Sequence, residues 1–303
     1  MEQRSVDRVV FVTLVRTAGE KPYARILIDS IRSFGGSLSR SPIWLFEANP
    51  QEVPCGDFER MGVQVLPLNV PGAVHHYLYS AKVAACARAE ELADSGVQSL
   101  VFLAPENLII TPPLLFDLGG AFDAAARPVH IKNVGLGVAE PLDGFWEGVY
   151  RAVGVRDVPI TVESFVDAQH IRAYFNSAAF SVNPSRGLFR RWSECFEALV
   201  CDEGFQSGPS QDIWHQVFLH QAVLSTLIAT TVAPTRLRIL PPDYVYPYNL
   251  HGSVPLERKA RALNDLVCIY AEDRSLDPDV VDDVEIHEPL RSWLSAHANA
   301  NAG

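Results

Sequence analysis

The stretch from Ser99 to Pro113 constrains the fold most, because it holds two short apolar runs separated by a polar break. The first run, Leu100–Leu103, has the composition of a strand buried on both faces of a mainly parallel sheet. It ends before Pro105, which has no backbone N–H to donate to a neighbouring strand, and a second apolar run follows at residues 108–110. The break therefore predicts polar side chains at the carboxyl end of a central strand, where open α/β sheets bind ligands.

The rest of the chain alternates between apolar runs of strand length and segments with helical spacing of apolar residues. We expect further strands at residues 9–15, 43–46, 63–68, 127–133, 179–182, 237–240 and 267–270. We expect helices at residues 23–34, 81–93, 141–151, 188–199, 213–229 and 290–297. This alternation predicts an α/β fold with a mainly parallel central sheet flanked by helices. We expect residues 1–254 to form one domain and residues 255–303 to form a C-terminal extension packed on it.

Composition and charge exclude several classes of function. A net charge of -11 argues against nucleic acid or an anionic membrane as partner, because binding to either requires an excess of Lys and Arg. No segment approaches the roughly 20 apolar residues of a membrane span, and the N-terminal segment lacks the apolar core of a signal peptide. Five scattered cysteines without a Cys-x-x-Cys pair favour neither a disulfide framework nor a zinc site. We therefore expect a soluble protein of a reducing cytoplasm.

Several common motifs are absent from the sequence. It contains no Gly-x-Gly-x-x-Gly, no Gly-rich loop followed by Lys-Ser/Thr, and no Gly-x-Ser-x-Gly. Their absence argues against dinucleotide binding, P-loop phosphate binding and α/β-hydrolase chemistry.

Four landmarks occur in order between residues 9 and 252. They are the loop at Thr13–Arg16, Lys82, the stretch from Tyr174 to Pro184 (Tyr-Phe-Asn-Ser-Ala-Ala-Phe-Ser-Val-Asn-Pro), and His220-Gln-Ala-Val-Leu-Ser with the later Leu240-Pro-Pro-Asp-Tyr-Val-Tyr-Pro. In this order they resemble the GT-A fold of nucleotide-sugar-dependent glycosyltransferases, in particular the retaining, glycogenin-like group. The resemblance implies a single GT-A-like domain that takes a nucleotide-sugar donor and an acceptor that the sequence does not identify.

The sequence departs from that family at the positions tied to metal. Such enzymes carry Asp-x-Asp at the end of the central strand, where two carboxylates hold Mn²⁺ or Mg²⁺. Here the positions read Ala104-Pro105-Glu106, the family's later metal-binding His is missing near residues 267–270, and the Asp of its Asp-Gln pair is His220. We therefore expect weak metal dependence or none, with Mn²⁺ or Mg²⁺ bound weakly through Glu106 if it binds at all.

The resemblance implies a donor site built from polar residues of these landmarks. The basic side chains of Arg16 and Lys82 are placed to neutralise a diphosphate, although either charge is also typical of a solvated loop. Glu106 is equally compatible with an exposed turn carboxylate beside Asn107. The predicted nucleotide and donor site comprises Thr13, Arg16, Lys82, Glu106, Asn107, Asn176, Ser177 and His251.

The candidate catalytic residues are Gln221 and His220, on the helix predicted at residues 213–229, and Asp212, which precedes that helix. Gln221 matches the Gln of the family motif, and a histidine can serve as a general base. A histidine on a largely apolar helix is also typical of a core residue whose hydrogen bonds are satisfied. Two functions follow: glycosyl transfer, or binding of a nucleotide, sugar or protein partner without catalysis.

Overall fold

The computed structural model describes residues 8–272, 274–279 and 283–301. Its centre is a seven-stranded sheet with the strand order β10-β6-β9-β4-β1-β2-β3. All neighbouring strands in it pair in parallel except β9, which is antiparallel to both β4 and β6. The strands of this sheet are β1 (Val9–Val15), β2 (Ile43–Glu47), β3 (Gln64–Pro67), β4 (Ser99–Leu103), β6 (Ala124–Ala126), β9 (Ala179–Val182) and β10 (Leu237–Ile239).

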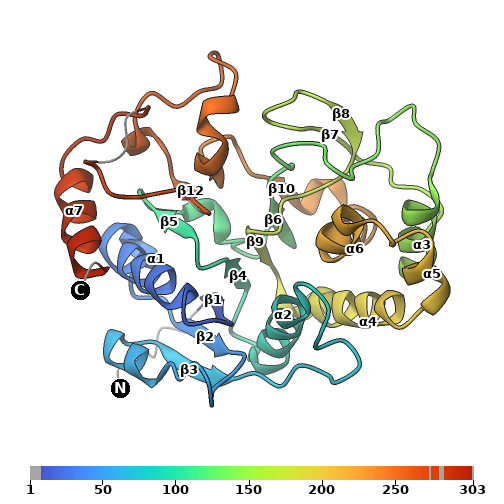
Figure 1. Cartoon of the computed structure of the whole chain (residues 1–303), viewed down its shortest axis with the longest axis horizontal. Helices are drawn as coiled ribbons and strands as arrows, with labels where there is room; N and C mark the ends of the chain where they lie inside the picture. Colours follow the sequence, from blue (N-terminus) through green and yellow to red (C-terminus); the bar gives the residue numbers. More distant parts are fainter. Residues whose placement is uncertain (1–7, 273, 280–282, 302–303) are drawn as a thin grey trace.

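Helices cover both faces of the sheet. Figure 1 shows α1 on one side, with α2, α4 and α6 on the other. The α-helices are α1 (Glu20–Phe34), α2 (Ser80–Leu92), α3 (Gly144–Val153), α4 (Leu188–Val200), α5 (Glu203–Ser207), α6 (Ile213–Thr231) and α7 (Leu290–Asn301). Short 3₁₀ helices lie at Gly36–Leu38, Gly56–Met61, Leu114–Phe116, Pro184–Arg186, Pro234–Arg236, Tyr248–Ser253 and Leu263–Asp265. The predicted α/β class with a mainly parallel, helix-flanked sheet is confirmed.

The middle of the sheet explains why polar groups collect at one edge. Every residue of β1 and β4 is buried, and their apolar residues belong to the main hydrophobic core. They run parallel, and their carboxyl ends therefore share one edge of the sheet. Because β9 is antiparallel to β4, its amino end lies at that same edge.

A second sheet joins the C-terminal part of the chain to the central break. It contains β11 (Tyr246–Pro247), β12 (Cys268–Tyr270) and β5 (Asn107–Ile109) in that order. The antiparallel pairing of β12 with β5 sets Tyr270 opposite Asn107. Further along the chain, α7 lies beside α1 (Figure 1), where the rings of Trp293 and Phe34 are 5.2 Å apart.

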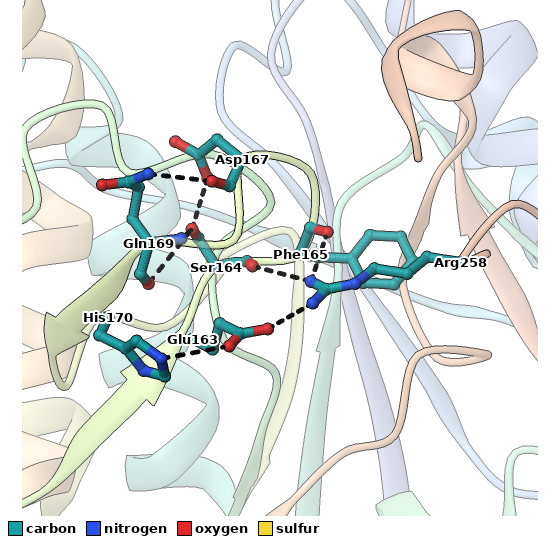
Figure 2. Close-up of polar contacts among 7 residues, drawn as sticks. All are labelled: Glu163, Ser164, Phe165, Asp167, Gln169, His170 and Arg258. Atoms are coloured by element: carbon teal, nitrogen blue, oxygen red, sulfur yellow. Dashed lines mark hydrogen bonds and ion pairs between the residues drawn. The ribbon is translucent and has the colours of Figure 1, made fainter. Parts of the chain in front are cut away.

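A small hairpin of β7 (Thr161–Glu163) and β8 (His170–Arg172) adds another link to the C-terminal part. Figure 2 shows its turn, in which the Ser164 hydroxyl donates to the Asp167 carboxylate and accepts from the backbone N–H of Gln169. The Arg258 guanidinium donates to the Glu163 carboxylate at 2.6 Å and to the carbonyl of Phe165 at 3.0 Å. Arg258 therefore fastens the segment after residue 254 to the hairpin.

The prediction of a strand at residues 127–133 was wrong. The strand at this place is β6, Ala124–Ala126, whose small side chains are fully buried between β9 and β10. Pro128 has no N–H for a ladder and forms only an isolated bridge with Phe175. The buried Arg127 side chain instead donates to the carbonyls of Pro242 and Tyr244.

Candidate active site

A cleft of about 440 Å³ lies at the edge where β1, β4 and β9 bring their polar ends together. Arg16 follows β1, Glu106 follows β4, and Asn176 and Ser177 precede β9. Helices α2 and α6 add further polar side chains to the lining. Seven of the predicted site residues line this cleft: Arg16, Lys82, Glu106, Asn176, Ser177, His220 and Gln221.

Arg16 is held by the first residue of α1. The Glu20 carboxylate accepts from the Arg16 backbone N–H at 2.6 Å and from its Nε at 2.8 Å. The guanidinium lies 5.7 Å from the centre of the Tyr79 ring. These contacts fix the arginine at the cleft. Its side chain remains 39% exposed, so a ligand in the cleft can still contact the guanidinium.

Lys82, in the first turn of α2, is a buried cation. Its Nζ donates to the carbonyl of Ser177 at 3.3 Å and lies 3.5 Å from Nε2 of His220. It also lies 4.7 Å from the centre of the Tyr79 ring. In the described part of the chain, no carboxylate lies within ion-pair distance of this ammonium. Burial, together with the charge of Arg16, lowers the pKa of Lys82 to about 8.

His220 faces Lys82 as a neutral ring. Its Nδ1 lies 3.0 Å from the carbonyl of Val217, which can only accept, so we assign the proton to Nδ1 and a lone pair to Nε2. Nε2 lies 2.9 Å from the Ser177 hydroxyl, and the ring stacks on Tyr79 with 4.2 Å between centres. Burial and the nearby Lys82 charge lower the pKa of His220 well below its usual value.

Gln221 is fixed by the backbone that leads into β9. Its Oε1 accepts from the Ser177 N–H and the Ser177 hydroxyl, both at 3.1 Å. The hydroxyl has one proton and two candidate acceptors, Gln221 and His220. Ser177 therefore joins both residues of α6 to the cleft wall.

The opposite wall comes from the C-terminal part of the chain. The Ala271 N–H donates to the carbonyl of Glu106 at 3.0 Å, which brings Tyr270 and Glu272 to the cleft. The Asn249 amide donates to the Glu272 carboxylate. Burial, with a contribution from the charge of Glu20, raises the pKa of Glu106.

Sequence reasoning did not find several of the residues that line the cleft. Three of them, Tyr79, Asn133 and Glu272, have positive φ angles of 63°, 45° and 49°. Non-glycine residues adopt this conformation at a cost, and such residues cluster at functional sites. A residue with a positive φ angle leaves no pattern of apolar residues in the sequence. The aromatic residues around Tyr79 are the one feature of the sequence that could have drawn attention to it. Trp214 and Tyr270 also line the cleft.

Four predicted site residues lie outside the cleft lining. Thr13 points away because Leu14 and Arg16 face the cleft and side chains alternate along a strand. Asn107 is buried and its Nδ2 donates to the carbonyls of Ala104 and Ala178, which ties the ends of β4 and β9 together.

The other two have separate structural contacts. Asp212 is the N-cap of α6, and its carboxylate accepts from the N–H groups of Trp214 and His215. His251 is fully buried, with Nδ1 accepting from the Tyr246 hydroxyl and Nε2 donating to the carbonyl of Asp283, both at 2.8 Å.

Comparison with known proteins gives matches to solved structures only. The sequence matches no protein-family model and no curated protein. The structure resembles the glycosyltransferase GlyE of Streptococcus pneumoniae (TM-score 0.52, 13% identity) over 95% of this chain and 59% of that one. It resembles the bifunctional glycosyltransferase WbbM (TM-score 0.53, 13% identity) over 95% and 51%. It also resembles the galactosyltransferase LgtC, solved with donor and acceptor sugar analogues (TM-score 0.51, 10% identity), over 96% and 95%.

The chain has a GT-A glycosyltransferase fold. At these identities the likeness establishes the fold alone. The chain spans little more than half the length of GlyE and WbbM and nearly all of LgtC. No helix in the described ranges is long and apolar enough to cross a membrane.

The residues at the end of β4 do not fit the divalent metal that this GT-A fold implies. Mn²⁺ and Mg²⁺ take several oxygen ligands, but Ala104 contributes only a methyl group where a carboxylate is expected. Across residues 8–272, 274–279 and 283–301, no three His, Cys, Asp or Glu side chains are grouped so that they could hold a metal ion. The ammonium of Lys82 and the guanidinium of Arg16 lie at the same cleft. The cleft therefore offers two cations to a ligand, beside the carboxylates of Glu106 and Glu272.

Proposed function

We propose that this protein is a glycosyltransferase that takes a sugar from a nucleotide-sugar donor, with the donor diphosphate bound by Lys82 and Arg16. The observation that carries the proposal is the buried Lys82 ammonium, which has no carboxylate at ion-pair distance among the described residues. Burying an unpaired charge costs several kcal/mol. An anion entering the cleft would offset that cost, and a diphosphate matches two cations. The GT-A fold supports the assignment to glycosyl transfer.

In the proposed reaction, an acceptor hydroxyl oxygen forms a bond to the anomeric carbon, and the bond between that carbon and the phosphate oxygen breaks. Negative charge accumulates on the departing diphosphate, which takes up the hydroxyl proton. Charges held in place before the reaction stabilise that leaving group without reorganisation. Arg16 is held by Glu20, and Lys82 by Ser177. Lys82 must carry its proton for this role. A Mn²⁺ or Mg²⁺ ion is not required by this arrangement.

The remaining cleft residues are assigned to sugar binding and positioning. We assign Gln221 and Asn176 to the hydroxyl groups of the transferred sugar, because both amides line the cleft and Gln221 is fixed by Ser177. His220 positions Ser177 and Lys82 through its Nε2. Its lowered pKa makes it a weak base in the free protein.

The domain arrangement belongs to the same proposal. Residues 1–254 would form the transferase domain, and the extension at residues 255–303 would complete the cleft wall through Tyr270. All five cysteines are free thiols, in keeping with a reducing cytoplasm as the location.

The direct test is turnover of nucleotide sugars. Purified protein would be incubated in EDTA with UDP-, GDP- and dTDP-sugars, with water as the acceptor of the sugar, and the released nucleoside diphosphate would be measured. We expect release from one of these donors, and a loss of at least about 100-fold in Lys82→Met, since removing a charge-stabilising group typically costs this much. Lys21→Met is the matched control, because Lys21 pairs with Asp57 at 2.9 Å and lies outside the cleft lining. Nucleotide binding without release above the Lys82→Met background would instead support a non-catalytic binding protein.

A further inference from the structure

A second groove of about 520 Å³ adjoins the cleft, and the two share Trp214 and Asn133. Trp214 is 60% exposed. The other four tryptophans, which also lie in the described ranges, are buried or partly buried. An exposed indole at the boundary between two cavities is unusual, because tryptophan is the largest apolar side chain and is highly buried on average.

The Trp214 ring is held in place by its own helix. Its backbone N–H donates to the Asp212 carboxylate at 2.7 Å, which caps the first turn of α6. The ring stacks on Phe218, one turn later, with 6.2 Å between centres and 12° between planes. The Phe218 ring therefore lies nearly parallel to the indole and beside it. The 60% exposure of the residue leaves apolar surface for a ligand.

The groove beyond Trp214 is acidic. Carboxylates of Glu140, Asp143 and Asp212 line it, against a single lysine, Lys132, whose Nζ pairs with Glu140 at 2.6 Å. A carboxylate has about four acceptor positions, so each of these groups can accept from a ligand hydroxyl in addition to its internal bonds. The surplus of negative charge disfavours an anionic ligand.

We propose that Trp214 and this groove bind a neutral oligosaccharide as the acceptor of the transfer. The apolar face of a sugar ring packs on an indole, and its hydroxyls donate to carboxylates, which is the combination this groove presents. A sugar on Trp214 lies at the boundary with the cleft, because Trp214 lines both cavities. The role of the bound sugar as an acceptor rests on the proposed function, whereas sugar binding itself can be tested separately.

The test measures binding of lactose, maltotriose, chitotriose and sialyllactose by NMR titration of the full-length protein. We expect at least one neutral probe to bind, sialyllactose to bind more weakly than lactose, and Trp214→Ala to weaken the bound probe about tenfold. Ile213→Ala is the matched control, because Ile213 is 56% exposed on the same helical turn and lines neither cavity. Both variants change exposed side chains, so both should fold.

Binding of UDP and GDP to the same proteins and to Lys82→Met separates the two proposals. We expect Lys82→Met, whose side chain lines the cleft but not the groove, to weaken nucleotide binding and to leave sugar binding unchanged. Sugar binding that is equal in Trp214→Ala and Ile213→Ala, or no binding of any probe, overturns the acceptor site even if the nucleotide binds. Sugar binding that depends on Trp214 without any nucleotide binding supports the sugar site and contradicts the donor site.

Discussion

At the scale of single residues, Lys82 distinguishes this cleft from an ordinary surface depression. Its ammonium is surrounded by the Ser177 carbonyl, the neutral ring of His220 and the faces of Tyr79 and Phe102. Cation–π contacts and one carbonyl compensate part of the desolvation cost. The remainder is expressed in the pKa of Lys82, lowered to about 8 from 10.5.

This lowered pKa makes a prediction about stability. Between pH 8 and 10.5 the unfolded chain holds the Lys82 proton more tightly than the folded chain, so this residue makes the free energy of unfolding rise with pH in that window. Below pH 8 the charged lysine destabilises the fold. We expect Lys82→Met to be about 1 to 3 kcal/mol more stable than the wild-type protein at pH 7, with the difference shrinking as pH rises to 10.5.

Urea unfolding at several pH values measures this difference. The difference between the two free energies of unfolding cancels the titration of groups that behave alike in both proteins. Lys21→Met controls for the loss of a lysine elsewhere in the chain, because Lys21 pairs with Asp57 and lies outside the cleft lining. A constant difference between Lys82→Met and wild type from pH 7 to 10.5 would contradict the account of Lys82 as a buried cation.

At the scale of elements, the start of α6 determines how its residues meet the cleft. The Asp212 cap accepts from two N–H groups of the first turn. His220 and Gln221 lie two turns further on, in the part of the helix that is buried on nearly every side. Trp214 therefore lies in the capped, exposed first turn of α6. His220 and Gln221 lie in the part of the helix that is packed in the core.

We expect Asp212→Ala to lower the free energy of unfolding by about 1 kcal/mol, because it removes an N-cap acceptor. Asp212→Asn should retain most of the stability, since an amide oxygen also caps a helix. Nucleotide affinity should stay within about twofold in both variants, because Asp212 does not line the cleft. Thermal unfolding with UDP or GDP titration measures both effects, and a selective loss of nucleotide binding would instead assign Asp212 to the donor site.

Individual elements show how far the sequence predicts this structure. The strands at Val9–Val15 and Ala179–Val182 were predicted with the bounds observed, because each is an apolar segment flanked by loop residues. The strand at residues 127–133 was wrong because apolar composition does not reveal that Arg127 is anchored to the carbonyls of a distant loop.

The cleft shows the same limit. Arg16, Glu106 and Ser177 lie where the ends of their strands place them, and strand ends can be read from the sequence. Tyr270 reaches the cleft through the pairing of β12 with β5, and pairing over such a separation leaves no local pattern. Tyr79 was missed because a left-handed residue before a helix is a property of the assembled structure.

At the scale of the whole molecule, the C-terminal part shares a buried cluster with earlier elements of the chain. Its residues Ile269, Leu290 and Leu294 are buried in one cluster with Ile26 of α1 and Leu108 of β5. β12 also pairs with β5 through backbone hydrogen bonds. Removing this part would expose apolar surface and leave the strand that follows Glu106 unpaired on that side.

We therefore expect a protein that ends at residue 254 to lose more than about 10 °C in Tm, or to remain unfolded. Circular dichroism and binding of a hydrophobic dye measure these outcomes. A longer protein that ends at residue 289, just before α7, should lose less in Tm, because β12 would remain. A protein ending at residue 254 that melts with the full chain would show that the extension is a separate unit.

The central claim is that protein cations, rather than a divalent metal, bind the donor diphosphate. Titration calorimetry of UDP and GDP against the wild-type protein and Lys82→Met, in EDTA and then in Mn²⁺, tests it most directly. We predict that wild-type protein binds one nucleotide equally well in both buffers and that Lys82→Met binds it at least about tenfold more weakly. Binding that requires Mn²⁺, or that is unchanged in Lys82→Met, would contradict the claim.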